Sequence, residues 1–157
     1  MLKRIIGQGE IAPANQHWLN LDALAQVEVT SEDAAHPIES GLLPGTASGW
    51  RAAQPGPQTV RLVFDQPQRI ARLHLEFHEE ELERTQQFVL RWSSNGGQSY
   101  REIVRQQYNF SPPGTTRERE DYPVDLDGVT TLELNIVPDI SGGPARASLA
   151  QFRLAQV

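Results

Sequence analysis

The feature of this sequence that most constrains its fold is a succession of short runs in which apolar and polar residues alternate. The clearest runs are 59–64, 70–77 and 130–136, with shorter ones at 26–30 and 149–154. Alternation with a period of two gives an extended strand one apolar face and one polar face. Turn residues separate the runs and a helical period is nearly absent, so we expect an all-β fold of packed antiparallel strands.

The connections between the expected strands alternate in length. Three are short: 65–69, 94–99 and 125–128. Four are long: 31–57, 78–86, 107–115 and 138–146. Alternate connections of an antiparallel up-and-down path lie at the same end, so we expect the long loops to meet at one end of the molecule. Binding residues are commonly carried on such loops, and we therefore expect the functional site there.

Two local signals refine the expected strands. Asn95–Gly96 predicts a hairpin turn between strands at 88–93 and 100–106, because this dipeptide supplies the positive φ angles of a tight turn. The run 116–121 carries charges on both faces. Charge on both faces is typical of an edge strand, which must not pair with other chains.

Length and composition bound the class of protein. The 157 residues suit one domain, with 1–25 as an N-terminal arm packing on the body and 26–157 as the sandwich. The net charge of −6 argues against nucleic acid as the main partner, which usually calls for a basic surface. The chain has no cysteine and no apolar run of signal-peptide or membrane-span length, so we expect no membrane span and a cytoplasmic location.

The order of these elements resembles the discoidin, or coagulation factor 5/8 C-type, domain of the galactose-binding domain-like superfamily. The resemblance covers about residues 26–156. Four segments carry it: Trp50–Arg51 at the end of the first long loop, the strands 59–64 and 70–75, the hairpin 88–100 and the closing strand 147–154. The resemblance implies a jelly-roll β-sandwich of about eight main strands, with carbohydrate as the inherited class of ligand.

Trp50–Ala53 is also similar to the N-terminal domain of a DNA single-strand-break repair scaffold protein and to Doc-type domains of ubiquitin-ligase subunits. These relatives imply that the same fold can bind a protein, and fold alone does not choose between the two classes of partner. Discoidin-type domains often hold a structural calcium ion in the first long loop. Here that loop offers the carboxylates of Glu32, Asp33 and Glu39, whereas calcium takes about six to eight oxygen ligands. We therefore expect no cofactor, with a structural calcium as the alternative.

Ten residues of the expected loop end are candidate ligand contacts: His36, Glu39, Trp50, Arg51, His78, Glu79, Tyr108, Asn109, Phe110 and Asp139. Trp50 could stack on a sugar ring while Arg51 donates hydrogen bonds to hydroxyls; alternatively, Trp50 plugs the core and Arg51 holds loop carbonyls. The Tyr108–Phe110 segment combines two aromatic rings with an amide, which suits a sugar; alternatively, it folds back on the sandwich.

One strand face could instead bind a metal. The run 70–77 is assigned an apolar face and a polar face that continues to His78. The apolar face holds Ala71, Leu73, Leu75 and Phe77, and the polar face holds Ile70, Arg72, His74, Glu76 and His78. Two imidazoles and a carboxylate on one face could hold zinc or nickel. The alternative is a solvated sheet surface on which Glu76 pairs with Arg72 or Arg91.

The leading hypothesis is a non-catalytic carbohydrate-binding module, because no triad, phosphate loop or metalloprotease motif is visible. A protein-interaction or scaffold domain is the first alternative. A metal-dependent enzyme that uses His74 and His78 is the weaker one.

Overall fold

The computed structural model describes residues 17–45 and 48–157. Within these ranges the chain forms eight strands and two one-turn helices, and all strand pairs are antiparallel. The helices are α1 (Leu21–Leu24) and α2 (Glu39–Leu42). The strands are β1 (Ala25–Val29), β2 (Trp50–Arg51), β3 (Gln58–His78), β4 (Arg84–Ser93), β5 (Arg101–Phe110), β6 (Arg117–Val137), β7 (Ser148–Leu149) and β8 (Gln151–Ala155). The all-β prediction with about eight strands is confirmed.

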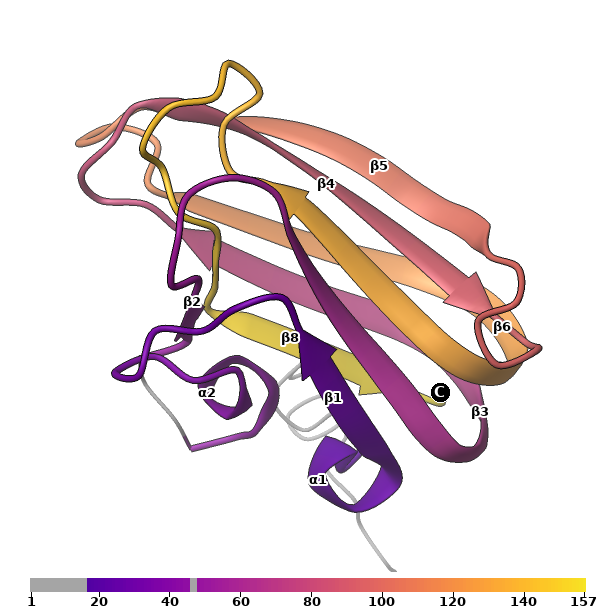
Figure 1. The fold of residues 1–157 in the computed structure, drawn as a ribbon. Helices are drawn as coiled ribbons and strands as arrows, with labels where there is room; N and C mark the ends of the chain where they lie inside the picture. Colours follow the sequence, from indigo (N-terminus) through magenta and orange to yellow (C-terminus); the bar gives the residue numbers. More distant parts are fainter. Residues whose placement is uncertain (1–16, 46–47) are drawn as a thin grey trace, which may run out of the picture.

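Two long strands, β3 and β6, contribute to both layers of a sandwich (Figure 1). In one layer the order is β1-β3-β6-β4-β5, and the other layer adds β8 to the second half of β3. The first half of β3 pairs with the second half of β6, and the remaining halves pair with each other. Both strands bend at the same level, where the register between them shifts. The hydrogen-bonded ladder therefore continues around the corner of the sandwich.

This continuity corrects two of the predicted turns. Segments 65–69 and 125–128 do not end strands but form the paired bends of β3 and β6, where Gln68 lies opposite Val129. The residues of the bends are those of turns, but they do not reveal that the two bends pair with each other.

The bend also corrects one assignment of faces on β3. Ile70 is fully buried, whereas Ala71 is only partly buried. The register shift between Ile70 and Arg72 moves the alternation of side chains by one position at this point. The sequence assignment, which placed Ala71 inside and Ile70 outside, is therefore wrong at these two positions.

The predicted hairpin is confirmed, and its second strand is longer than expected. β4 pairs with β5 across a turn in which Gly96 and Gly97 have φ angles of 73° and 90°. β5 continues to Phe110, so the expected loop 107–115 shrinks to 111–116. The Tyr108–Phe110 segment is therefore part of a strand and not of a loop.

The predicted edge strand is the first half of β6. In the described part of the chain this half pairs only with β3. One of its charged residues, Glu118, nevertheless points inward and is 1% exposed. The prediction of an edge is confirmed, while the expectation that both faces meet solvent fails at this residue.

The core lies between the two layers. Its largest fully buried side chains are Trp50, Phe77, Phe88, Phe110 and Phe152, together with Leu62, Ile70, Leu73, Leu75, Leu90, Leu132 and Leu134. They come mainly from the inward positions of β3, β4, β6 and β8, as the alternating patterns predict.

The connections gather by length, as the sequence predicts. Figure 1 shows the segments 79–83, 111–116 and 138–147 at one end of the sandwich, and the β4–β5 hairpin with the bends of β3 and β6 at the other. We call the first of these the loop end. No helix in the described ranges is long and apolar enough to cross a membrane.

The chain reaches the sandwich through residues just before α1. Trp18 forms a β-bridge with Ala155, and the Leu19 amide donates to the Leu154 carbonyl at 2.7 Å. The expected N-terminal arm at 1–25 falls largely on residues 1–16, which lie outside the described ranges.

Candidate functional site

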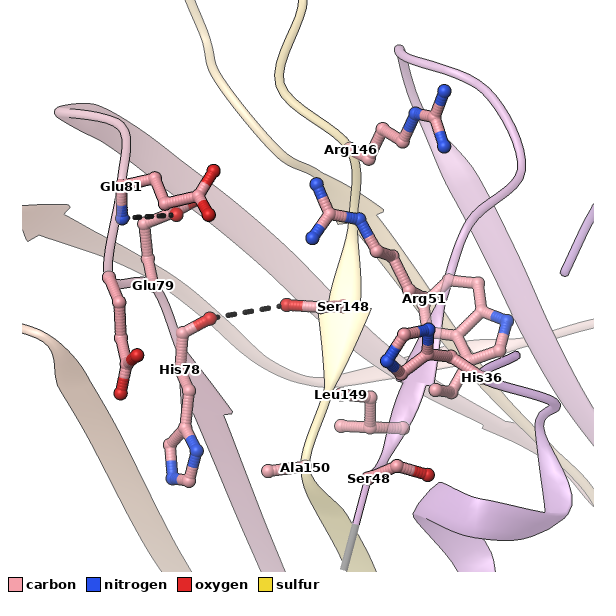
Figure 2. A pocket seen from close by; sticks show the side chains of 12 residues that line it. His36, Ser48, Arg51, His78, Glu79, Glu81, Arg146, Ser148, Leu149 and Ala150 are labelled. Carbon is pink, nitrogen blue, oxygen red and sulfur yellow. Dashed lines mark hydrogen bonds between the residues drawn. The ribbon is translucent and has the colours of Figure 1, made fainter. Parts of the chain in front are cut away.

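A cleft of about 220 Å³ opens at the loop end (Figure 2). It is formed by the loop before β3, by segment 79–83 and by the segment that leads into β7. Five of the predicted ligand contacts line it: His36, Trp50, Arg51, His78 and Glu79. The structure thus brings together residues that lie up to 43 positions apart in the sequence (79 minus 36).

The short β2–β7 pair builds one wall of the cleft. Arg51 lies directly opposite Ser148, so the two side chains share a face of the pair. Arg146 is two residues before Ser148 in a stretch of alternating burial and lies on the same side. Gly49 permits this close pairing, because its φ is 66° and a Cβ there would lie 2.8 Å from the Leu149 carbonyl oxygen.

Trp50 supports the wall from inside. Its side chain is 1% exposed, and its indole N–H donates to the Ser31 carbonyl at 3.0 Å. No face of the ring is available to stack on a sugar. Of the two roles that the sequence allows for Trp50, the structure shows the plug of the core.

The opposite wall is the acidic segment after β3. Glu79 accepts from the Arg84 Nε at 2.6 Å and from the backbone amides of Glu81 and Leu82 at 3.0 and 3.2 Å. Burial by itself would raise the pKa of Glu79, but these hydrogen bonds outweigh burial and hold the pKa below its usual range. Glu79 is thus an ionised anchor of the wall, whereas Glu80 and Glu81 are exposed.

Two imidazoles flank the cleft. The buried Nδ1 of His36 has no partner among the described residues, although its backbone holds Arg51 and Asp33 in place. His78 lies on the other side, and its backbone carbonyl accepts from the Ser148 hydroxyl at 3.3 Å. Partial burial, assisted by the charge of Arg117, lowers the pKa of His78, so its ring is neutral at neutral pH.

The cleft is therefore polarised. Among the described residues, none forms a hydrogen bond or ion pair with the Arg51 guanidinium. Figure 2 shows this guanidinium between the β7 segment and the side that carries Glu79 and Glu81. A guanidinium only donates hydrogen bonds and an ionised carboxylate only accepts them. The arrangement suits a ligand rich in hydroxyl groups, which can do both.

Tyr108 and Phe110 are occupied by the protein itself, and Asn109 is occupied through its side-chain oxygen. Phe110 is fully buried with its ring 5.0 Å from that of Tyr108, whose hydroxyl donates to the Arg117 carbonyl at 2.7 Å. Asn109 accepts from the Thr85 hydroxyl at 2.7 Å. Of the two interpretations of the Tyr108–Phe110 segment, the structure shows the one in which it packs on the sandwich.

Asp139 and Glu39 also lie outside the cleft. Asp139 accepts from the amide and the hydroxyl of Ser141, and these bonds lower its pKa. Together with Asn109 and Phe110, it lines a second cavity of about 560 Å³ at the loop end. Glu39 is exposed in the first turn of α2 and borders a small apolar depression with Leu42. Neither joins the five residues of the cleft.

The two histidines of the suggested metal site line different surfaces. His74 lies between Asp121 and Glu76, with its ring nitrogens 2.8 and 3.0 Å from their carboxylates, whereas His78 lines the cleft. Glu76 pairs with His74 and Arg119, not with Arg72 or Arg91 as the alternative interpretation had it. Within the described ranges no group of three or more His, Cys, Asp or Glu could hold a metal.

The ten candidate contacts leave out several residues of this region. Glu80, Glu81, Arg146 and Ser148 line the cleft, and Arg84 anchors it from below. The alternation of Ala145 to Leu149 could have indicated that Arg146 and Ser148 share a face. Nothing in the local pattern indicates that Arg84 turns inward, because an arginine at a strand's start usually meets solvent.

Comparison with known proteins assigns the fold. No family model and no curated protein matches the sequence. Solved structures do match, with identities low enough that the likeness concerns the fold alone. They share the jelly-roll β-sandwich fold that the resemblance to discoidin domains implies.

Three of these structures show the range of proteins with this fold. The first holds two CBM32 modules of Clostridium perfringens ZmpB in complex with GalNAc, with a TM-score of 0.65, 14% identity, and coverage of 96% of this chain and 39% of that one. The second is a pectin-binding carbohydrate-binding module, with a TM-score of 0.59, 17% identity, and coverage of 83% and 89%. The third is reduced XRCC1 bound to the catalytic domain of DNA polymerase β, with a TM-score of 0.59, 16% identity, and coverage of 85% and 97%.

Proposed function

We propose that this domain is a non-catalytic carbohydrate-binding module that holds a sugar in the loop-end cleft. Arg51 donates to sugar hydroxyls from one wall, and Glu80 and Glu81 accept from hydroxyls on the other. The imidazoles of His36 and His78 flank the ring and supply further polar atoms. The bound sugar is not chemically altered.

The observation that carries this proposal is the polarised cleft itself. It joins the Arg51 guanidinium, which has no hydrogen-bond or ion-pair partner among the described residues, to two exposed carboxylates in a space of about 220 Å³. Vicinal hydroxyls of a pyranose can accept from one wall while donating to the other, which a purely anionic or cationic ligand cannot do. Several structural neighbours are carbohydrate-binding modules, which supports the same class of ligand.

The proposal is tested by calorimetry and a glycan array on the purified chain. GalNAc, galactose and oligogalacturonate are the first probes, since neutral and acidic sugars distinguish which wall dominates. We expect binding to at least one of them and its loss in Arg51→Gln. Arg105→Gln is the matched control, because Arg105 is an exposed arginine on β5 that pairs with Glu102 and lies away from the cleft. A folded sample that binds no glycan on the array would overturn the proposal.

A protein-interaction domain is the second candidate, and two side chains favour it. Leu82 and Ile140 are 40% and 52% exposed and belong to segments 79–83 and 138–147 of the loop end. A structural neighbour, XRCC1, was solved bound to another protein. If Leu82→Ser and Ile140→Ser abolish capture of one identified protein while glycan binding is absent, this second function replaces the first.

A further inference from the structure

A buried cation lies beneath the cleft. The Arg84 side chain is 1% exposed, and its planar group stacks on Phe110 with 4.7 Å between the guanidinium carbon and the ring centre. Its Nε donates to Glu79 at 2.6 Å, and its Nη1 donates to the Pro138 carbonyl at 2.7 Å and to the Gln86 side chain at 3.2 Å. A buried charge needs such partners, because its desolvation is otherwise very costly.

Two of these bonds hold separate loops of the loop end. Glu79 in turn accepts from the amides of Glu81 and Leu82, so Arg84 fixes the acidic wall through one carboxylate. The Pro138 carbonyl begins the segment that leads to Arg146 and β7, the basic wall. One side chain from β4 therefore connects the two walls of the cleft without lining it itself.

A second buried carboxyl lies on the other side of Arg84. Glu118 accepts from the Gln86 amide group at 3.1 Å, and Gln86 accepts from Arg84, so the three side chains form a chain. Two buried atoms of this chain have no partner among the described residues: Arg84 Nη2 and Glu118 Oε2. Arg84 thus has a spare donor and Glu118 a spare oxygen within one network.

We propose that Arg84 is the positioning residue of the cleft, and that the protonation state of Glu118 sets how firmly Arg84 holds Glu79. While Glu118 is neutral, Glu79 is the single anionic partner of Arg84 and segment 79–83 is fixed. When Glu118 ionises, it competes for the guanidinium and loosens the acidic wall. The effect on ligand rests on the proposed function, whereas the effect on the segment does not.

The groups that face Glu118 favour its neutral form at neutral pH. Burial and the neighbouring Glu120 raise the pKa of Glu118 to about 8, against the opposing influence of Gln86 and Arg84. Tyr122 lies on the same face of β6, and its hydroxyl donates to Glu120 at 2.9 Å. Among the described residues of β4, Arg84 is the charged group that acts on Glu118, and Glu79 acts through Arg84. Glu118 therefore changes charge in the range just above neutral pH.

The experiment measures amide exchange of the whole chain by NMR, expressed as protection factors to remove the intrinsic pH dependence. In the unmodified protein, the protection of the Glu81 and Leu82 amides should fall severalfold between about pH 6 and about pH 9. Glu118→Gln should keep the protection of both amides level across this range. Core amides such as those of Leu132 and Leu134 serve as the internal reference for global opening.

Two further variants separate positioning from general support. Arg84→Lys keeps the charge but not the fork of donors, and should lower the protection of Glu81 and Leu82 by about tenfold. Glu79→Gln should do the same, and it serves if the Arg84 variant fails to fold. If the variants lower the protection of the core amides as much as that of Glu81 and Leu82, Arg84 only supports the fold and the proposal fails. The proposal also fails if the protection of Glu81 in the unmodified protein does not change with pH.

A second experiment titrates the protein with GalNAc by calorimetry, at the lower and the higher pH of the exchange measurement. Affinity should be severalfold weaker at the higher pH in the unmodified protein and independent of pH in Glu118→Gln. If exchange changes as expected but no GalNAc binds, the positioning role stands and the proposed sugar function is what fails. If GalNAc binds equally at both pH values while exchange changes, the link from segment to ligand is wrong.

Discussion

Two groups of predicted contacts meet at the loop end, and they differ in how their polar atoms are used. In the cleft, Arg51 and His36 keep donor or acceptor atoms without a partner among the described residues. On the β5 side, the Asn109 side-chain oxygen accepts from the Thr85 hydroxyl, and the Tyr108 hydroxyl donates to the Arg117 carbonyl. Arg84 lies between the two groups, with Phe110 on one side and Glu79 on the other.

Residue type and position at a loop end are therefore not enough to make a ligand contact. Both groups combine aromatic, amide and charged side chains, and both lie at the correct end of the sandwich. What distinguishes them is whether the chain itself satisfies their hydrogen bonds, because an atom already paired gains little from a ligand. The following predictions test this distinction, in order of decreasing effect.

Phe110→Ala should affect the fold more than the ligand. The ring is fully buried between Tyr108 and Arg84, so its removal should lower the free energy of unfolding by about 3–5 kcal/mol. Urea unfolding measures this loss, and calorimetry on the folded fraction should show a smaller loss of sugar affinity than Arg51→Gln causes, because Phe110 reaches the cleft through Arg84. A stable variant that no longer binds would place the sugar on the β5 side.

Glu118→Gln should change how stability depends on pH. The folded pKa of Glu118, about 8, lies above the ordinary glutamate value of 4.5, so the folded chain holds the proton more tightly than the unfolded chain. The stability that this group contributes is complete below the unfolded pKa and is lost as pH rises through about 8, by up to a few kcal/mol.

Denaturant unfolding at a series of pH values measures this dependence. The parent should lose stability between about pH 5 and about pH 8, and the variant should lose much less. If the free energy of unfolding depends on pH equally in the parent and the variant, Glu118 is already ionised in the folded protein.

Arg51→Gln should have the opposite profile to Phe110→Ala. The side chain is exposed, so the free energy of unfolding should stay within about 0.5 kcal/mol of the parent. The loss of a charged donor should weaken sugar binding by about tenfold to a hundredfold. Asn109→Ala is the matched control from the β5 side and should bind as the parent does; equal losses in both variants would erase the distinction between the two groups.

Calcium should have the smallest effect. In the first long loop, Glu32 accepts from the Ile38 amide at 2.7 Å and Asp33 from the Ala35 amide at 2.9 Å, so both carboxylates already serve the loop. Adding calcium or a chelator should therefore shift the thermal midpoint by less than about 1 °C. A larger rise that saturates with calcium would show that the loop holds the ion after all.

The sequence was sufficient for the architecture because alternation and turn residues are local properties. The faces of β3 could be assigned from Leu73 to Phe77, and the hairpin at Asn95–Gly96 needed only its own dipeptide. The paired bends at 65–69 and 125–128 could not be foreseen in the same way. Whether a Pro- or Gly-containing segment ends a strand or bends it depends on what lies opposite, which is a non-local property.

The site was predictable in position and only partly in detail. Arg51, His36 and His78 could be placed at one end from the lengths of the connections. The inward turn of Arg84 and the burial of Phe110 could not, since both depend on β5 continuing past Gln107 and on Glu118 pointing inward. Burial of charged groups is a compromise among distant partners, and no local pattern records it.

The most direct measurement is an NMR titration of the labelled chain with the sugar that binds most tightly on the array. The account predicts that the amide shifts that change lie around the cleft, at His36, Arg51, Glu81, Arg146 and Ser148, while those of Asn109 and Asp139 stay constant. Changes that centre on Asn109 and Asp139, or on the outer face of β5, would contradict it.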